Sequence, residues 1–538
     1  MTFPSTETLD RWAFWPLFAV LGALFTLPIL IVWHPPAMDL PGHLALAEVL
    51  ASRHSHHDPY SGLFSLPSWP SPNTLYYYLV GGLARFIPIE WASKTVLCLS
   101  LLGTPLALAA ARQANGQGRA LALTGFPLAL SFNFIAGFVG FVMALPLMVW
   151  LGALAKTQVH EPTRGRAALI ALVATITYLC HAQVFLFAVG LVGLIALCGA
   201  WAETPGSPRC QTPLLGGLRR FLATTSPILV PIALALPWYL DRVRLLRRHG
   251  SMDMRFPGLE HNLRFLPIHT FDQLAGDRDL WLGLGVVAGM LGLAALSLLP
   301  RYRARPSELE EPPGPVALLP SPRARFLSLL AKGSFWLATL AAVITYFALP
   351  GHIRFQAVIN GRQAIVALLL MAVAIRVPRG RLPVAVLTTT IALGGAYGAH
   401  YASATLRLDE ELRGFPELLR KTRPGSRLVD PYRPKTRIFR MDVLRHLGSY
   451  HMVWSRGLVA DTFARWPVQP IRTTRFFHMP GFAPHRPDPY HYVLSGRPLA
   501  APRLSRLGSA GFYHLYQVLP APRRAPTTPR PVPSGNLR

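Results

Sequence analysis

A carboxylate and an imidazole four residues apart are the first pair in the chain that could do chemistry together. Asp39 and His43 follow an apolar block, and prolines on both sides of Asp39 break the helix there. If residues 39–43 begin a helical turn, the two side chains share a face. Such a pair can act as a general base on an acceptor hydroxyl or contribute to a metal site. The alternative is that Asp39 caps a helix and His43 is an interfacial residue.

Two arginines further along the chain are candidates for binding phosphate. Arg354 and Arg362 lie at an outer loop and the start of the next apolar block. The planar guanidinium group binds phosphate oxygens bidentately, and we therefore predict both as phosphate ligands. The alternative is that each is an interfacial residue that extends its charge toward water. The four arginines within residues 241–248 are either a second phosphate contact or part of an ordinary long loop.

Histidines form the third group of candidates. Three of them fall within residues 54–58, but the fixed spacing of structural metal sites is missing, and a solvated loop is the competing interpretation. We predict no metal ligands, although a divalent metal stays an open alternative. His181 stands at the turn of a tight hairpin, and His261 and His269 lie in a polar loop. These three are predicted to line a cavity, with a packing role as the alternative for His181.

The elements that must position these residues are lipid-spanning helices. The chain has 538 residues, of which 51% are hydrophobic and only 14% charged. Soluble domains carry about 25% charged residues, and we therefore exclude an ordinary cytosolic enzyme. The formal net charge of +28 comes from arginines between apolar blocks, where they set membrane topology. We predict no nucleic-acid partner, because no recognition module is visible.

Apolar blocks of about 20 residues predict the individual spans. Three longer blocks are each about right for two short helices, with turns near Asn133, near His181 and at residues 376–381. The total is about eleven spans. The single blocks are 13–33, 91–112, 217–240, 280–300 and 326–349, and the longer ones are 119–155, 167–202 and 363–400.

The basic connections predict the orientation. Lys and Arg prefer the cytoplasmic side, which places these connections there together with the N-terminus. The opposite side then receives the loops 34–90, 241–279 and 350–362 and the whole tail from Tyr401. Residues 74–89, which contain three tyrosines, are predicted to form a helix lying at the outer interface.

The predicted fold is therefore an all-α polytopic membrane domain over 1–400 followed by a small extracytoplasmic α/β domain over 401–520. Short β-branched and aromatic runs at 426–430 and 512–519 are the expected strands. The last residues, 521–538, are rich in Pro and Arg and are predicted to be disordered.

The order of these features resembles the GT-C superfamily of membrane glycosyltransferases. The sequence AspLeuProGlyHis at 39–43 is similar to the DxPxH loop of uncharacterised bacterial members, and residues 132–140 are similar to their aromatic-glycine turn. The resemblance implies a polyprenyl-phosphate-sugar donor, an outer-face active site and inverting transfer to an acceptor. It also implies that Asp39 is the base or metal ligand. Several members carry paired acids where this chain has one, which argues against a metal-dependent mechanism.

The leading hypothesis is thus an integral membrane glycosyltransferase of a bacterial inner membrane. It would move a sugar from a polyprenyl phosphate to a lipid, glycan or protein acceptor. The competing hypotheses are a transporter or lipid flippase and a non-catalytic envelope-assembly protein. A transporter would show internal repeats and charges near the bilayer centre. In this sequence the polar candidates instead gather at the predicted outer ends of helices.

Overall fold

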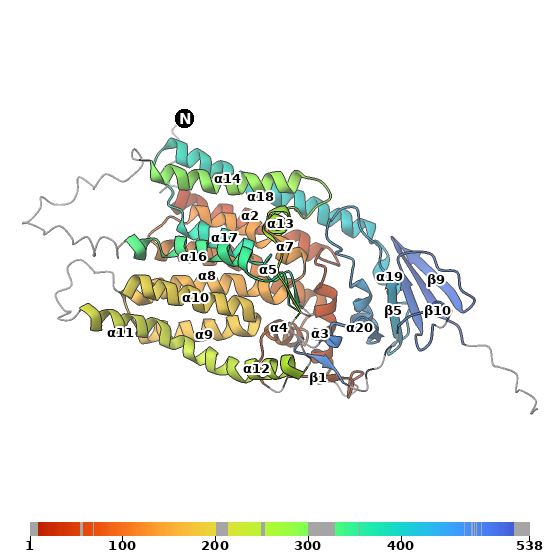
Figure 1. Ribbon diagram of the computed structural model, residues 1–538. Helices are drawn as coiled ribbons and strands as arrows, with labels where there is room; N and C mark the ends of the chain where they lie inside the picture. Colours follow the sequence, from red (N-terminus) through yellow and green to blue (C-terminus); the bar gives the residue numbers. More distant parts are fainter. Residues whose placement is uncertain are drawn as a thin grey trace, which may run out of the picture.

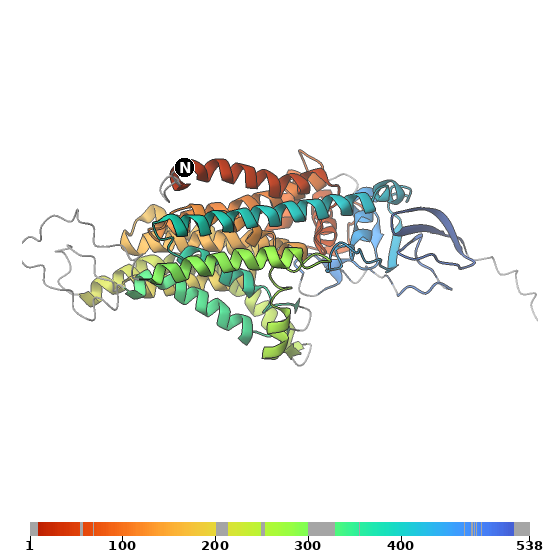
Figure 2. The same cartoon turned by 90° about the horizontal axis from the view of Figure 1, so that it is seen from above.

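The structure is a computed structural model, and it has a helical bundle at one end and a β-sheet at the other (Figures 1 and 2). The helical bundle and the C-terminal sheet confirm the predicted fold class, a polytopic α-helical membrane domain with a small α/β region. The described residues are 9–53, 58–67, 69–200, 213–248, 253–299, 329–353, 356–466, 469–474, 477, 479, 481–485 and 487–520.

Seven helical segments are long and apolar enough to cross a membrane, counted over the described residues. Many of their large apolar side chains are exposed on the surface of the bundle, as is typical of helices that face lipid. The segments are α2 (Phe14–Ile31), α5 (Ile89–Ala114), α8 (Val139–His160), α10 (Ala182–Ala200), Leu215–Arg244 within α11 (Pro213–Thr225) and α12 (Leu229–Arg248), α14 (Arg278–Leu298), and Arg381–Leu419, which contains α18 (Arg381–Glu411) and α19 (Phe415–Leu419).

The other predicted spans are shorter helices. They are Ala120–Ile135, which comprises η2, α6 and α7, together with α9 (Arg164–Cys180), α16 (Ser334–Ala348) and α17 (Gln363–Ala374). Each long apolar block divides where the sequence predicted a turn. His181 is extended between α9 and α10, Gly137 has a φ of +75° just before α8, and Gly380 caps α18.

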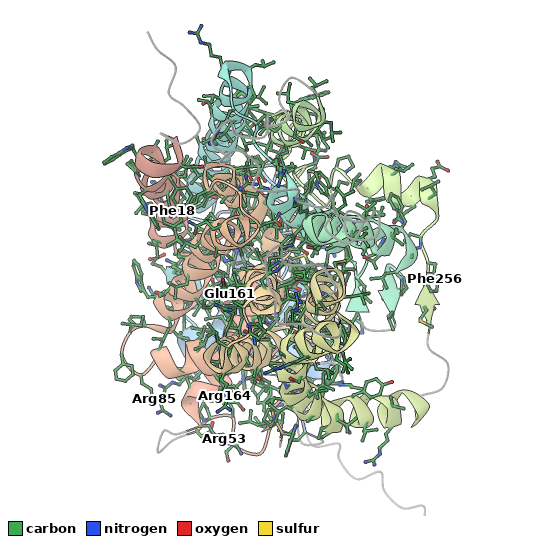
Figure 3. All side chains as sticks on the ribbon, turned by 90° about the vertical axis from the view of Figure 1, so that its left-hand side faces the viewer. Phe18, Arg53, Arg85, Glu161, Arg164 and Phe256 are labelled. Atoms are coloured by element: carbon green, nitrogen blue, oxygen red, sulfur yellow. The ribbon has the colours of Figure 1, made fainter. Side chains whose placement is uncertain are left out.

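The described basic connections follow α5, α8 and α17, and they lie at the end of the bundle where α2 begins (Figure 1). Figure 3 looks at this end, where Glu161 and Arg164 mark the connection between α8 and α9. The sheet and the N-terminus of α3 (Leu40–Ser52) lie at the opposite end (Figure 1). One end of the bundle therefore carries basic connections between helices, and Asp39 lies at the other end.

Helix α4 (Leu75–Leu83) lies in the segment predicted to form an interfacial helix. Its nine residues span about 14 Å at the α-helical rise, less than half of the hydrocarbon thickness. Tyr76 and Tyr77 face inward and are buried, while Tyr78 is exposed. This helix packs against α3 and α5 and helps to enclose the space beyond the bundle.

The C-terminal region is a mixed sheet with the strand order β6-β5-β8-β10-β9. The two predicted strands are confirmed as β5 (Arg427–Tyr432) and β10 (Tyr513–Val518). Strand β5 runs parallel to β6 and β8, and β10 runs antiparallel to β8 and β9. The other strands are β6 (Leu458–Val459), β8 (Tyr492–Ser495) and β9 (Leu504–Ala510).

The predicted domain boundary at residue 400 falls within a helix. Helix α18 continues through it to Glu411, because apolar and small residues keep the helix packed against α2 and α14. Beyond it, η5 (Leu447–Ser449) and α20 (Tyr450–Ser455) pack directly on α3. The C-terminal region is thus built onto the loop that follows the first span.

Polar contacts fix this junction. The His34 imidazole lies 3.1 Å from the hydroxyl of Tyr450, and the Trp33 amide donates to Asp409 at 3.0 Å. Strand β1 (Phe64–Ser65) pairs antiparallel with β7 (Arg472–Thr473). The loop after the first span and the C-terminal region, some 400 residues apart in sequence, are therefore joined in one structural unit.

Candidate active site

A cavity of about 1160 Å³ lies between the bundle and the C-terminal region. This volume exceeds the usual range for drug-sized ligands, which is about 300–1,000 Å³. The cavity has a polar limb beside the C-terminal region and an apolar limb that follows the helices inward. The polar limb is lined by Asp39, His43, His181, Arg242, Arg362, Arg445, His446, Asp461 and Gln469.

The apolar limb runs between two helices. On α10 it is lined by Phe187, Gly190, Leu191 and Leu194, which recur at the spacing of one helix face. On α16 the corresponding residues are Ala338, Ala341 and Thr345. From Ala182 to Leu194 the lined stretch of α10 is about 18 Å long at the α-helical rise. The limb therefore reaches well into the depth of a bilayer.

The backbone around Asp39 is held by the aromatic-glycine turn. Asp39 is the N-cap residue of α3, and a proline follows in the first turn. The amides of Met38 and Asp39 donate to the carbonyls of Ile135 and Ala136 at 2.8 and 3.2 Å. A Cβ on Gly137 would lie 2.5 Å from the Asp39 nitrogen, and its φ of +75° also favours glycine. Only glycine lets the turn approach this closely.

The Asp39 carboxylate faces the cavity with about a fifth of its side chain exposed. Burial raises its pKa to about 7, against the opposing effect of Arg445 and Arg362. One carboxylate oxygen lies 3.6 Å from Nε2 of His446. At neutral pH this group is therefore poised between its protonated and ionised forms.

His43 is held by a different partner. Its Nδ1 lies 2.7 Å from the hydroxyl of Tyr77, and Phe463 packs edge-on against its ring. Burial lowers the pKa of His43 to about 3, and the imidazole is neutral. Asp39 and His43 therefore both line the cavity. The imidazole next to the Asp39 carboxylate is that of His446.

Arg362 projects from the N-terminus of α17 into the cavity. One Nη donates to Nε2 of His181 at 3.1 Å and the other to the carbonyl of Ala357 at 3.2 Å. Its guanidinium group lies 4.0 Å from the centre of the Phe138 ring. Burial lowers its pKa to about 10, so it stays charged at neutral pH. His181 accepts this hydrogen bond and lies on the wall, where it was predicted.

Two predicted cavity residues lie elsewhere. His261 is exposed on α13 (Leu259–Phe265) and stacks on Phe265 at a centroid distance of 4.3 Å. His269 is buried and its Nδ1 lies 3.0 Å from the hydroxyl of Tyr346, so its ring packs inside the fold. Neither is among the residues that line this cavity.

The other predicted residues fall outside the described part of the chain. These are Arg354 and the histidines of 54–57. Within the described residues there is no group of three or more His, Cys, Asp or Glu side chains that could hold a metal ion.

Several cavity residues were not predicted. Arg445, His446, Asp461 and Gln469 come from the C-terminal region, about 400 residues after Asp39 in the sequence. No local pattern distinguishes them from neighbouring polar residues. Arg242 is different, because it belongs to the arginine cluster within residues 241–248, for which the sequence offered a second phosphate contact as one interpretation.

Comparison with known proteins finds similarity among solved structures alone. No protein-family model matches the chain, and no curated protein matches it. Among solved structures, the crystal structure of ArnT from Cupriavidus metallidurans bound to undecaprenyl phosphate is similar, with 13% identity and a TM-score of 0.43. The match covers 94% of this chain and 98% of that one.

Proposed function

We propose that this protein is an integral membrane glycosyltransferase of the GT-C type. It transfers a sugar from a polyprenyl-phosphate donor to an acceptor on the extracytoplasmic face of a bacterial inner membrane. One observation carries the proposal: a single cavity joins an apolar limb among the helices to a polar limb with arginines and the Asp39 carboxylate.

The apolar limb suits the tail of the donor. A polyprenyl chain must stay in an apolar medium while its phosphate and sugar reach water. Leu191 and Leu194 on α10 and Ala338 and Ala341 on α16 supply such walls along the bundle. Burying apolar area contributes about 25 cal/mol per Å², so a long tail adds substantial affinity.

The phosphate is assigned to the arginines of the polar limb. Arg362 and Arg445 are the cations whose charge acts on Asp39, so both lie near the place where the chemistry would occur. Phosphate as the leaving group gains negative charge as the bond to the sugar breaks. Fixed positive charges aimed at that oxygen stabilise the transition state. Arg242 lines the same cavity and adds to the positive field.

Asp39 is assigned as the base. A general base works best when its pKa is near the working pH, and burial places the pKa of Asp39 at about 7. It would take the proton from the acceptor hydroxyl as that oxygen attacks the sugar carbon opposite the phosphate. Such in-line attack inverts the configuration at that carbon.

The test separates donor binding from transfer, using the full chain in lipid nanodiscs. Binding of undecaprenyl phosphate is measured by native mass spectrometry. Release of undecaprenyl phosphate from a panel of undecaprenyl-phosphate-linked sugars is measured in the presence of a membrane lipid extract. Asp39→Asn is expected to bind undecaprenyl phosphate and release none from the donors. A transporter would move the donor without this release.

The Arg362→Ala, Arg445→Ala double variant is expected to lose donor affinity. Each charged hydrogen bond contributes about 1.5–3 kcal/mol, so a loss of about 100-fold or more is expected. Arg503→Ala is the matched control, because Arg503 pairs with Asp488 on the sheet and does not line the cavity. Unchanged binding by the double variant would remove these arginines from the donor site.

A further inference from the structure

His446 lies between two carboxylates at the edge of the cavity. Its Nε2 is 3.6 Å from the Asp39 carboxylate, and its Nδ1 is 4.0 Å from the carboxylate of Asp461. The ring is 8% exposed, whereas the Asp461 side chain is 44% exposed. The two nitrogens therefore face two carboxylates of unequal exposure, Asp39 at 20% and Asp461 at 44%.

The surrounding residues hold the ring in this place. Phe463 packs edge-on against His446 at 4.6 Å and against His43 at 5.1 Å. Gly42 leaves room for the Phe463 ring, because a Cβ there would lie 2.9 Å from it. Helical turn η5 follows His446 directly and packs on α3, the helix that begins after Asp39.

Electrostatics favours one tautomer of His446. Asp461 forms an ion pair with Arg433, and its carboxylate oxygens can accept a hydrogen bond. Arg445, Arg433 and His43 also act on His446, and burial lowers its pKa to about 3, so the ring is neutral. A neutral imidazole has one N–H. We assign that hydrogen to Nδ1, toward Asp461, so that Nε2 can accept a proton from Asp39 once Asp39 has taken it from the acceptor.

We propose that Asp39, His446 and Asp461 form a proton relay from the reacting centre to the solvent. This inference rests on the proposed function and adds a role for the C-terminal region in it. His446 touches neither donor nor acceptor in this scheme, and it acts through Asp39.

The relay moves one proton from the acceptor hydroxyl to water. The acceptor O–H bond breaks as its oxygen bonds to the sugar carbon, and the bond from that carbon to the phosphate oxygen breaks, with its electron pair staying on the phosphate. Asp39 takes the acceptor proton and passes it to Nε2 of His446. The proton on Nδ1 moves at the same time to Asp461 and then to water.

Concerted movement fits the burial of the ring. An imidazolium ion is costly at this position, but simultaneous entry and exit of a proton keeps the ring neutral. The distances of 3.6 and 4.0 Å are bridged by a small side-chain rotation or one water, as is usual before substrate binds. Exchange of the ring protons with water between turnovers restores the starting tautomer.

The first test is chemical rescue in the full-length protein. His446→Ala is expected to bind undecaprenyl phosphate normally and to lose transfer by about 100-fold to 10,000-fold, the usual range for a lost proton transfer. Added imidazole is expected to restore part of the rate. Asp461→Asn, at a more exposed position, is expected to slow transfer and to alter its pH profile.

The matched control is His451→Ala. His451 is a buried histidine of the same region that bonds to Thr422 and Ser426 and does not line the cavity. Any loss in this variant is expected to be insensitive to imidazole. Wild-type transfer by His446→Ala, or a loss with no imidazole rescue and an unchanged pH profile, would overturn the relay.

The second test needs no enzymatic activity. Nitrogen-15 NMR of histidine-labelled protein in nanodiscs, with the His446 signal assigned from His446→Gln, reports which ring nitrogen carries hydrogen. The relay requires hydrogen on Nδ1 at neutral pH and a shift toward Nε2 in Asp461→Asn. Hydrogen on Nε2 in the wild type would overturn the relay. Failure of all donors to react would count against the proposed function, and this measurement would still decide the relay.

Discussion

The position of Asp39 in the fold makes its carboxyl group a weaker acid. Burial opposes its ionisation, and Arg445 and Arg362 only partly compensate, leaving its pKa at about 7. The same feature has two consequences. It brings the base close to physiological pH, and it makes the folded state less stable wherever the group must ionise.

The pH dependence of transfer should follow this pKa. Below about pH 7 Asp39 is protonated and cannot accept the acceptor proton, so transfer is expected to rise through that pH and then level off. A rate measurement from pH 5 to pH 9 on the wild type checks this. A flat profile across the range would contradict Asp39 as the base.

The pH dependence of the melting temperature gives a second, independent test of the raised pKa of Asp39. A raised pKa means that the native state binds the proton more tightly, so stability is present at low pH and lost as pH rises toward about 7. Asp39→Asn should therefore raise the melting temperature above pH 7 and have little effect near pH 4. Asp488→Asn is the control, because Arg503 lowers the pKa of Asp488 and its loss should not stabilise the fold.

At the scale of elements, α10 decides the shape of the apolar limb. Its cavity-facing positions recur every three or four residues, so a single helix face forms one wall. Gly190 lies in this face, and a Cβ placed there would meet nothing within 4 Å. The missing side chain keeps the limb open.

Filling this position should block the tail of the donor. Gly190→Leu is expected to lower the affinity for undecaprenyl phosphate by about tenfold or more while the melting temperature is kept or raised, because glycine is a poor helix former. Gly193→Leu is the matched control. It also has open space at its Cβ and lies one turn away on α10, but it does not line the cavity. Equal affinities for the two variants would show that the tail does not use this limb.

At the scale of the whole molecule, the bundle has two unlike ends. The described basic connections lie at the end where α2 begins, and α3 and the sheet lie at the other (Figure 1). Because Lys and Arg prefer the cytoplasm, the polar limb of the cavity, which Asp39 and the C-terminal region line, should face outward. This orientation is required if a lipid-linked sugar is to meet its acceptor outside the cell.

A reporter fusion tests the orientation. Alkaline phosphatase is active only outside the cytoplasm, and a fusion after Pro520, at the end of the described chain, is expected to be active. A fusion in the connection after His160, at the opposite end of the bundle, is the control and should be inactive. The reverse pattern would place the cavity on the cytoplasmic side and contradict the proposed reaction.

The sequence by itself determined the membrane helices and the first candidate residue. Hydrophobic length and breaker residues are local properties, so the spans and the turns near His181 and residues 376–381 could be predicted. Asp39 could be identified because prolines and an apolar block surround it. Arg362 and His181 could be nominated from their positions at predicted helix ends.

The tertiary structure alone decided which residues share the cavity. Arg445, His446 and Asp461 reach Asp39 through the packing of η5 and α20 on α3, a contact between segments about 400 residues apart. No periodicity encodes such a contact, since it depends on how long-range surfaces fit together. Tertiary packing elsewhere turned His269 toward Tyr346, and the burial of Asp39 gave this carboxyl its raised pKa.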